Sequence, residues 1–118
     1  MEFHAQKAIF LQIADLLTDG IMEEKWKVDE RIPSVREFAT SLEVNPNTVM
    51  RAYSYLQDQE IIANKRGIGF FVSPNANHKI IAIKREEFIK LEVPRISKMM
   101  KLLDLSFDEL KKLISDIE

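Results

Sequence analysis

The segment Val44–Leu56 passes from a turn into a helix within a few residues. Asn45 can accept hydrogen bonds from the free N–H groups of a first helical turn, and Pro46 suits the first helical position. The apolar residues that follow have the spacing of one buried helix face: Val49, Ala52, Tyr53 and Leu56. The opposite face carries Asn47, Arg51 and Ser54, with Thr48 and Met50 beside them. A solvated face is usually rich in Glu and Lys, so this composition indicates a role beyond solubility.

Two further helices are predicted before this segment. Lys7–Lys25 contains apolar residues at helical spacing, namely Ile9, Ile13, Leu16, Leu17 and Ile21. After Pro33, Ser34 and Glu37 have the spacing of a capping box, which predicts the start of a short helix. Its expected buried side is Val35, Phe38, Ala39 and Leu42. The short connection to Pro46 suits two helices that cross steeply.

Two β-prone runs follow the third helix. Ile61-Ile62 and Phe70–Val72 flank a Lys-Arg-Gly turn, and Gly67 and Gly69 supply the backbone freedom that a hairpin tip needs. Three helices followed by a hairpin form a winged helix-turn-helix. The predicted fold class is therefore mainly α with a small β-hairpin, an N-terminal winged helix-turn-helix followed by a short α-helical tail.

Composition excludes several classes of protein. The 118 residues are 46% hydrophobic, which fits one small domain with an appendage. The absence of cysteine excludes disulfide frameworks, zinc fingers and thiol nucleophiles, and without a long apolar run we expect a cytoplasmic protein. His4 and His78 lie far apart in sequence, and no metal-ligand spacing is present. We therefore expect neither an enzyme nor a bound cofactor or metal.

The third helix and the hairpin tip suggest contact with DNA. A major groove admits an α-helix, whose short polar side chains and Arg can reach base edges, while basic residues at a wing suit phosphates. The candidate DNA-binding residues are Arg36, Asn45, Asn47, Thr48, Arg51, Ser54, Lys65, Arg66 and Gly67. Asn45 is expected to act first as a cap. The alternative to DNA contact is that the third helix is an ordinary solvated helix with a well-capped start.

Charge gives only permissive support to this hypothesis. The net charge of the chain is −2, whereas a nucleic-acid-binding domain often has a strong basic excess. Residues 31–75 carry five basic side chains against four acidic ones, so the middle of the chain is the least acidic part of its first two-thirds. A winged-helix adaptor that binds protein and not DNA is the alternative. Such an adaptor would need an apolar or acidic outer face on the third helix. The mild acidity of the whole chain is consistent with this alternative.

The segment RIPSVREFATSLEVNPNTVMRAYSYLQDQEIIANKRGIGFFVS resembles the winged helix-turn-helix of the GntR family of transcriptional regulators, and VNPNTVMRAY resembles its YtrA subfamily. The matching positions are Pro33, Ser34, Arg36, Ala39, Val44, Thr48, Val49, Ala52, Leu56, Gly67, Gly69, Phe71 and Val72. Many family members have Arg in place of Pro46 and Met50, so base contacts at those two positions cannot be transferred. The family's Gly after the third helix is Glu60 here. The resemblance implies a dimeric DNA-binding regulator, often a repressor, with transporter operons and its own gene among possible targets.

The remaining chain is expected to be a dimerisation tail. We predict a DNA-binding domain over 1–75 and a helical tail over 76–118, with Ser73–His78 as a linker and helix from about Lys79. Pro94 should kink or break that helix. Ser106 and Glu109 form a second candidate capping box, which should start the last helix.

The apolar positions of the tail repeat at helical spacing. The candidate dimerisation residues are Ile89, Val93, Ile96, Met100, Leu103, Leu110, Leu113 and Ile117. A tail of this length cannot bury such a stripe alone, so we expect it to pack against a second copy. Folding back onto the winged domain is the alternative. A two-fold dimer would place two recognition helices about 34–36 Å apart, and its operator would be an inverted repeat.

Overall fold

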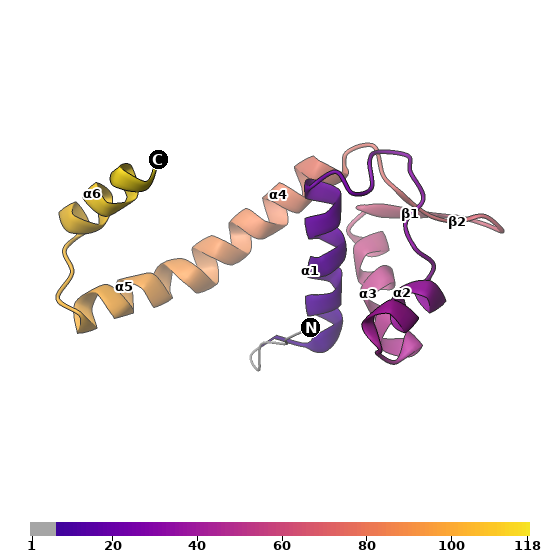
Figure 1. Ribbon diagram of the computed structural model, residues 1–118, viewed down its shortest axis with the longest axis horizontal. Helices are drawn as coiled ribbons and strands as arrows, with labels where there is room; N and C mark the ends of the chain where they lie inside the picture. Colours follow the sequence, from indigo (N-terminus) through magenta and orange to yellow (C-terminus); the bar gives the residue numbers. More distant parts are fainter. Residues whose placement is uncertain (1–6) are drawn as a thin grey trace. The chain divides into compact units, whose positions relative to one another are not determined.

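The computed structural model describes residues 7–118, which divide into two compact units, one up to Ile81 and one from Ala82 to Glu118. The first unit contains α1 (Ile9–Met22), α2 (Val35–Leu42), α3 (Pro46–Asp58), β1 (Ile62–Lys65) and β2 (Gly69–Val72), as Figure 1 shows. Three helices and a two-stranded antiparallel hairpin confirm the fold class expected from the sequence. α1 is shorter at both ends than the predicted Lys7–Lys25.

Local capping signals begin α2 and α3 as predicted. The Ser34 hydroxyl accepts from the Glu37 N–H at 3.0 Å, and the Glu37 carboxylate accepts from the Ser34 N–H at 3.1 Å. Asn45 Oδ1 accepts from the Asn47 N–H at 2.8 Å, and Pro46 is the first residue of α3. Each helix start therefore satisfies N–H groups that have no partner within the helix.

The core of the first unit forms where α1 and α2 pack against α3. The predicted stripe of α3 is fully buried and meets the stripe of α1; the shared core includes Ile13, Leu17, Ile21, Val49, Ala52, Tyr53 and Leu56. The Tyr53 hydroxyl donates to the Pro33 carbonyl, and its ring contacts Phe38 and Phe70 at centroid distances of 6.3 and 5.1 Å. This one side chain ties α3 to the start of α2 and to the hairpin.

The hairpin is held in register by its strand pairs and by the segment before α2. Ile62 pairs with Val72 and Lys65 pairs with Gly69. Arg31 bridges to Phe71, and the Ile32 N–H donates to the Phe70 carbonyl at 3.0 Å, so a third short stretch supports β2. Gly69 has φ of +140°, and a Cβ there would lie 2.8 Å from Arg31 Nε. Only glycine fits this position without displacing Arg31.

The expectation of a linker over Ser73–His78 is wrong in its second half, because α4 (Ala76–Glu87) begins within it. Ala76 is 0% exposed and Ile80 is 1% exposed, and both belong to the first unit. Lys79 Nζ lies 2.9 Å from Glu60 Oε2, which anchors the start of α4 to the end of α3. Burial of the small Ala76 outweighs the loop-like composition around it.

The tail contains the π-helical turn η1 (Phe88–Glu92), α5 (Val93–Leu102) and α6 (Phe107–Ile117). Of the two outcomes predicted at Pro94, a kink or a break, the break does not occur, because the chain stays helical from Ala76 to Leu102. Pro94 has no N–H for the carbonyl four residues earlier, and its ring crowds that carbonyl. The wider π turn ends at Glu92, two residues before Pro94, where a change in the hydrogen-bond pattern can accommodate the ring.

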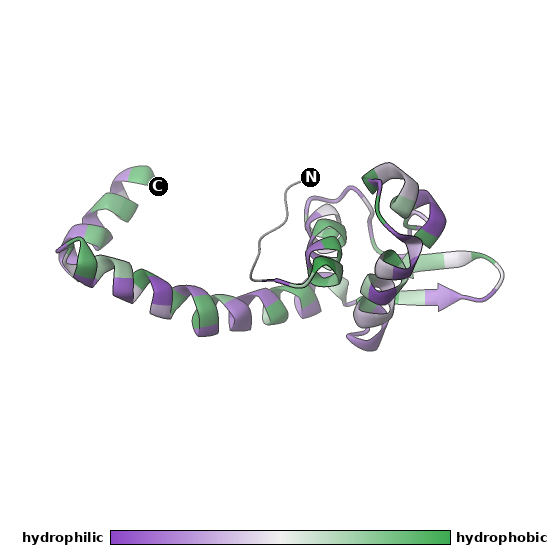
Figure 2. Ribbon diagram, turned by 90° about the horizontal axis from the view of Figure 1, so that it is seen from below, coloured by the Kyte–Doolittle hydropathy of each residue, from purple (hydrophilic) through white to green (hydrophobic). Residues whose placement is uncertain are grey.

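The last helix begins as predicted. The Ser106 hydroxyl accepts from the Glu109 N–H at 3.1 Å, and the Glu109 carboxylate accepts from the Ser106 N–H at 3.3 Å, which confirms the second capping box. Figure 2 shows that strongly hydrophobic residues recur along the tail helices. Within residues 7–118, no helix combines the length and apolar character needed to cross a membrane.

Candidate nucleic-acid interface

The outer face of α3 carries the polar residues identified from the sequence. Asn47 and Arg51 are exposed, while Thr48 and Ser54 are half-buried at its edges. These residues lie opposite the buried stripe, so core packing fixes the helix while leaving their polar ends accessible. Met50, where many family members have Arg, is 41% exposed on the same side.

Asn45 has a defined structural role. Its side-chain oxygen accepts from the Asn47 N–H, so the predicted capping function is confirmed. A capping Asn still has a side-chain amide group that can donate to a phosphate. The free N–H groups and the positive dipole end of α3 lie in the same turn.

Arg51 stacks on an aromatic ring that sequence reasoning did not select. Its guanidinium carbon lies 4.1 Å from the centroid of Phe10, which belongs to α1. Phe10 in turn meets Tyr55 edge-on, at a centroid distance of 6.2 Å and an interplanar angle of 75°. Phe10 lies three, seven and eleven residues before Ile13, Leu17 and Ile21, so helical spacing places it in line with the buried stripe of α1. Its partners belong to another helix, and only the packing of α1 on α3 brings Phe10, Arg51 and Tyr55 together.

The wing presents two cations and a glycine at its tip. Lys65 Nζ lies 4.1 Å from the centroid of the Phe71 ring on the neighbouring strand, which holds the ammonium group close to the hairpin. Arg66 and Gly67 are exposed, and Gly67 has φ of +80° with open space where a Cβ would be. Ile68 is also exposed at this tip, to 63%.

Two further arginines lie near the start of α2. Arg36 is exposed in its first turn, as expected for a side chain that could reach a DNA backbone. Arg31 was not a candidate from the sequence, yet its guanidinium lies 3.7 Å from Glu37 Oε1 and beside Gly69 of the wing. The Ser34 N–H and hydroxyl, and then Arg31, hold the pKa of Glu37 below its usual range. Glu37 therefore stays ionised and keeps the helix cap intact.

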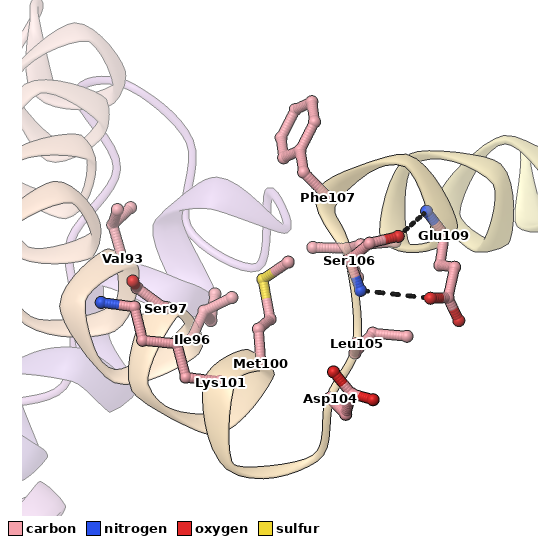
Figure 3. Close-up of a pocket in the computed structure, with 11 residues that line it drawn as sticks. Val93, Ile96, Ser97, Met100, Lys101, Asp104, Leu105, Ser106, Phe107 and Glu109 are labelled. Atoms are coloured by element: carbon pink, nitrogen blue, oxygen red, sulfur yellow. Dashed lines mark hydrogen bonds between the residues drawn. The ribbon is translucent and has the colours of Figure 1, made fainter.

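The predicted dimerisation residues are mostly exposed in the single chain. Ile89, Val93, Ile96, Leu103, Leu113 and Ile117 are exposed by 51%, 45%, 38%, 67%, 53% and 84%. Val93, Ile96 and Met100 of α5 and Leu110 of α6 line an open groove of about 780 Å³ within the tail, shown in part in Figure 3. Leu105, between these helices, and Phe107, the first residue of α6, complete its apolar lining. The other four candidates lie outside this groove.

Nothing in the described part of the chain resembles a metal site. Among residues 7–118 no group of three or more His, Asp or Glu side chains could hold an ion. His78 is exposed on α4, and His4 lies outside the described residues.

A capped helix with a polar outer face, a second helix packed against its start and a basic hairpin together define a winged helix-turn-helix domain. The sequence pattern of the bacterial regulatory proteins, gntR family, matches residues 10–72. The chain therefore belongs to the GntR family, within its YtrA subfamily, and is a DNA-binding transcriptional regulator. The resemblance drawn from the sequence is confirmed.

Three relatives illustrate this assignment. The uncharacterized HTH-type transcriptional regulator YhcF of Bacillus subtilis is 32% identical over 109 residues, covering 92% of this chain and 88% of that protein. The HTH-type transcriptional repressor YtrA of the same organism is 41% identical over 73 residues, which are 62% of this chain and 53% of YtrA. A crystal structure of a GntR-family regulator from Bacteroides thetaiotaomicron is 45% identical with a TM-score of 0.78, covering 93% of this chain and 96% of that one.

Proposed function

We propose that this chain acts as a dimeric repressor that binds an inverted-repeat operator with α3 and the wing. The observation that carries the proposal is the outer face of α3, where Asn47, Arg51 and Ser54 lie opposite a fully buried stripe. A rigidly packed helix with short polar groups and one Arg suits direct readout in a major groove.

Each DNA-binding residue has a distinct proposed role. Arg51 reads a guanine, since a guanidinium can donate two parallel hydrogen bonds to that base. The neighbouring polar residues of α3 contact base edges or the flanking backbone, and they are Asn45, Asn47, Thr48 and Ser54. Arg36 binds a phosphate from the first turn of α2. The wing contacts the backbone through Lys65 and Arg66, while Gly67 permits close approach.

The tail serves dimerisation in this proposal. We assign residues 1–75 to the DNA-binding domain and residues 76–118 to the dimerisation tail, whose first residues, up to Ile81, pack as part of the first unit. The exposed apolar side chains of α5 and α6 support this assignment, because helices of this length are marginal in water without a buried face. Packing against the same helices of a second copy would cover the groove and the surrounding residues, and the resulting two-fold symmetry requires a symmetric operator.

The class of protein supports the proposals of repression and of a cytoplasmic location. YtrA of Bacillus subtilis is named as a transcriptional repressor, and a regulator of this kind contacts chromosomal DNA in the cytoplasm. A protein bound to an operator that overlaps a promoter excludes polymerase, which is the simplest mode of repression.

The decisive experiment is selection of binding sites from random double-stranded DNA by the full chain, with light scattering on the same preparation. We expect an enriched motif with two-fold symmetry and a mass of two chains at micromolar concentration. A motif without internal symmetry, bound by a single chain, would overturn the dimeric reading. Failure to enrich any motif at low salt would overturn the operator-binding role itself.

A further inference from the structure

The ring of Phe10 lies between two residues of α3 that are one helical turn apart. The Arg51 guanidinium covers its face at 4.1 Å, and Tyr55 meets it edge-on at 6.2 Å. Positions 51 and 55 share one edge of α3, so a ring supplied by α1 sits on that edge and supports the polar face beside it. Phe10 itself is half-buried, which leaves room for the stacked Arg51.

Stacking constrains an arginine without using up its donors. The face of the guanidinium contacts the ring, while the N–H groups point outward in the guanidinium plane. Within residues 7–118, Arg51 forms no ion pair and no side-chain hydrogen bond, so no acceptor in the described part of the chain occupies its fork of donors. A stacked arginine is thus held in orientation and kept available for bidentate pairing.

We propose that Phe10 is a positioning residue for sequence readout, and that it holds Arg51 in the orientation needed to pair with a base. This inference rests on the proposed role of Arg51. A free arginine side chain samples many rotamers. Binding that fixes one rotamer costs conformational entropy and so weakens the affinity. A ring already stacked in the free protein removes part of that loss. Phe10, which positions the base-reading Arg51, therefore belongs to α1 and lies outside the helix-turn-helix itself.

The test compares two substitutions of Phe10 on the selected operator and on random DNA. Phe10→Leu keeps an apolar side chain without an aromatic face, whereas Phe10→Tyr keeps the ring. We expect Phe10→Leu to weaken operator binding about 3- to 10-fold with less than about twofold change on random DNA. Phe10→Tyr should bind like the parent chain. Ile9→Ala, on an exposed neighbour in α1, controls for general effects on that helix, and thermal unfolding verifies that each variant is folded.

A double-mutant cycle with Arg51→Ala separates positioning from packing. If Phe10 acts through Arg51, Phe10→Leu should have no further effect on operator affinity once Arg51 is Ala. An equal loss in both backgrounds, or an equal loss on operator and random DNA, would overturn the positioning role and leave the role of Arg51 intact. Unchanged operator binding by Arg51→Ala alone would instead remove the proposed base contact, and this inference would fall with it.

Discussion

The two units of the chain differ in what their helices bury. In the first unit, aliphatic side chains such as Ile13, Leu17 and Leu56 are completely buried, whereas from Ala82 to Glu118 every residue is either half-buried or exposed. This difference in burial does not come from the residues that start the helices, because α2 and α6 both begin with complete capping boxes. Capping decides where helices begin, and only packing partners decide whether they are stable. The first unit contains its partners, and we infer that the tail finds them in a second copy.

The largest effect should come from opening the core of the first unit. Leu17→Ala leaves a cavity beside α3 and should lower the free energy of unfolding by about 2–5 kcal/mol. Leu113→Ala, at a side chain 53% exposed in the single chain, should change the unfolding of the first unit little. Urea denaturation of both variants measures the contrast. Similar losses at the two positions would contradict the division into a self-sufficient unit and a dependent one.

A charge in the groove of the tail should dissociate the dimer. Ile96→Glu places a carboxylate among Val93, Met100 and Leu110, and should cost about 2–4 kcal/mol of dimer stability if this surface lies at the centre of the interface. Lys98→Ala changes the net charge equally at an exposed site of α5 and is the control. Analytical ultracentrifugation gives the dimer dissociation constant. An unchanged dissociation constant for Ile96→Glu would show that the dimer interface lies elsewhere than in this groove.

The DNA-binding unit should separate base readout from backbone attraction. Arg51→Ala should weaken operator binding by about 1–3 kcal/mol with a smaller change on random DNA. Lys65→Ala should weaken binding to operator and to random DNA more evenly. It should also lower the number of counterions released on binding, which the salt dependence measures, by roughly one. Titrations at several salt concentrations check both variants. Equal losses on operator and random DNA from Arg51→Ala would contradict base readout.

Local features of the first unit could be predicted from sequence because neighbouring residues determine them. The Asn45-Pro46 start and the Ser34–Glu37 box need only three or four consecutive positions, and the structure confirms both. The buried stripe of α3 follows from helical geometry alone. Such features depend on spacing along the chain, and spacing is visible in a single sequence.

Contacts between distant segments were not predictable in this way. The stack of Arg51 on Phe10 joins residues from two helices, and the approach of Arg31 to Gly69 joins a loop to the wing. The start of α4 at Ala76 was missed for the same reason, because burial in the first unit overrides a Ser-Pro-Asn sequence that favours a loop. The sequence allowed a break at Pro94 because it gave no sign of the π turn just before it.

The two capping boxes offer a matched pair of variants. Ser34→Ala and Ser106→Ala each remove a hydroxyl that accepts from the third residue of its helix, and each should cost about 0.5–2 kcal/mol. The cost of Ser34→Ala should appear in the unfolding of the first unit. The cost of Ser106→Ala should appear in the dissociation constant of the dimer. If Ser106→Ala left dimerisation unchanged, α6 would not contribute to the interface.

The smallest effect should be the acid sensitivity of the Ser34 cap. The pKa of Glu37 lies below its usual value because the Ser34 N–H and hydroxyl, and then Arg31, stabilise the carboxylate. A carboxyl with a lowered folded-state pKa adds stability above its unfolded pKa, about 4.3, and that stability is lost as the pH falls through the folded value. Because Glu37 is exposed, the contribution is small. Glu37→Gln should therefore lower the melting temperature slightly at pH 7 and leave it unchanged at a pH well below 4. A difference between parent and variant that persisted or grew in acid would show that the carboxylate does not stabilise this helix start.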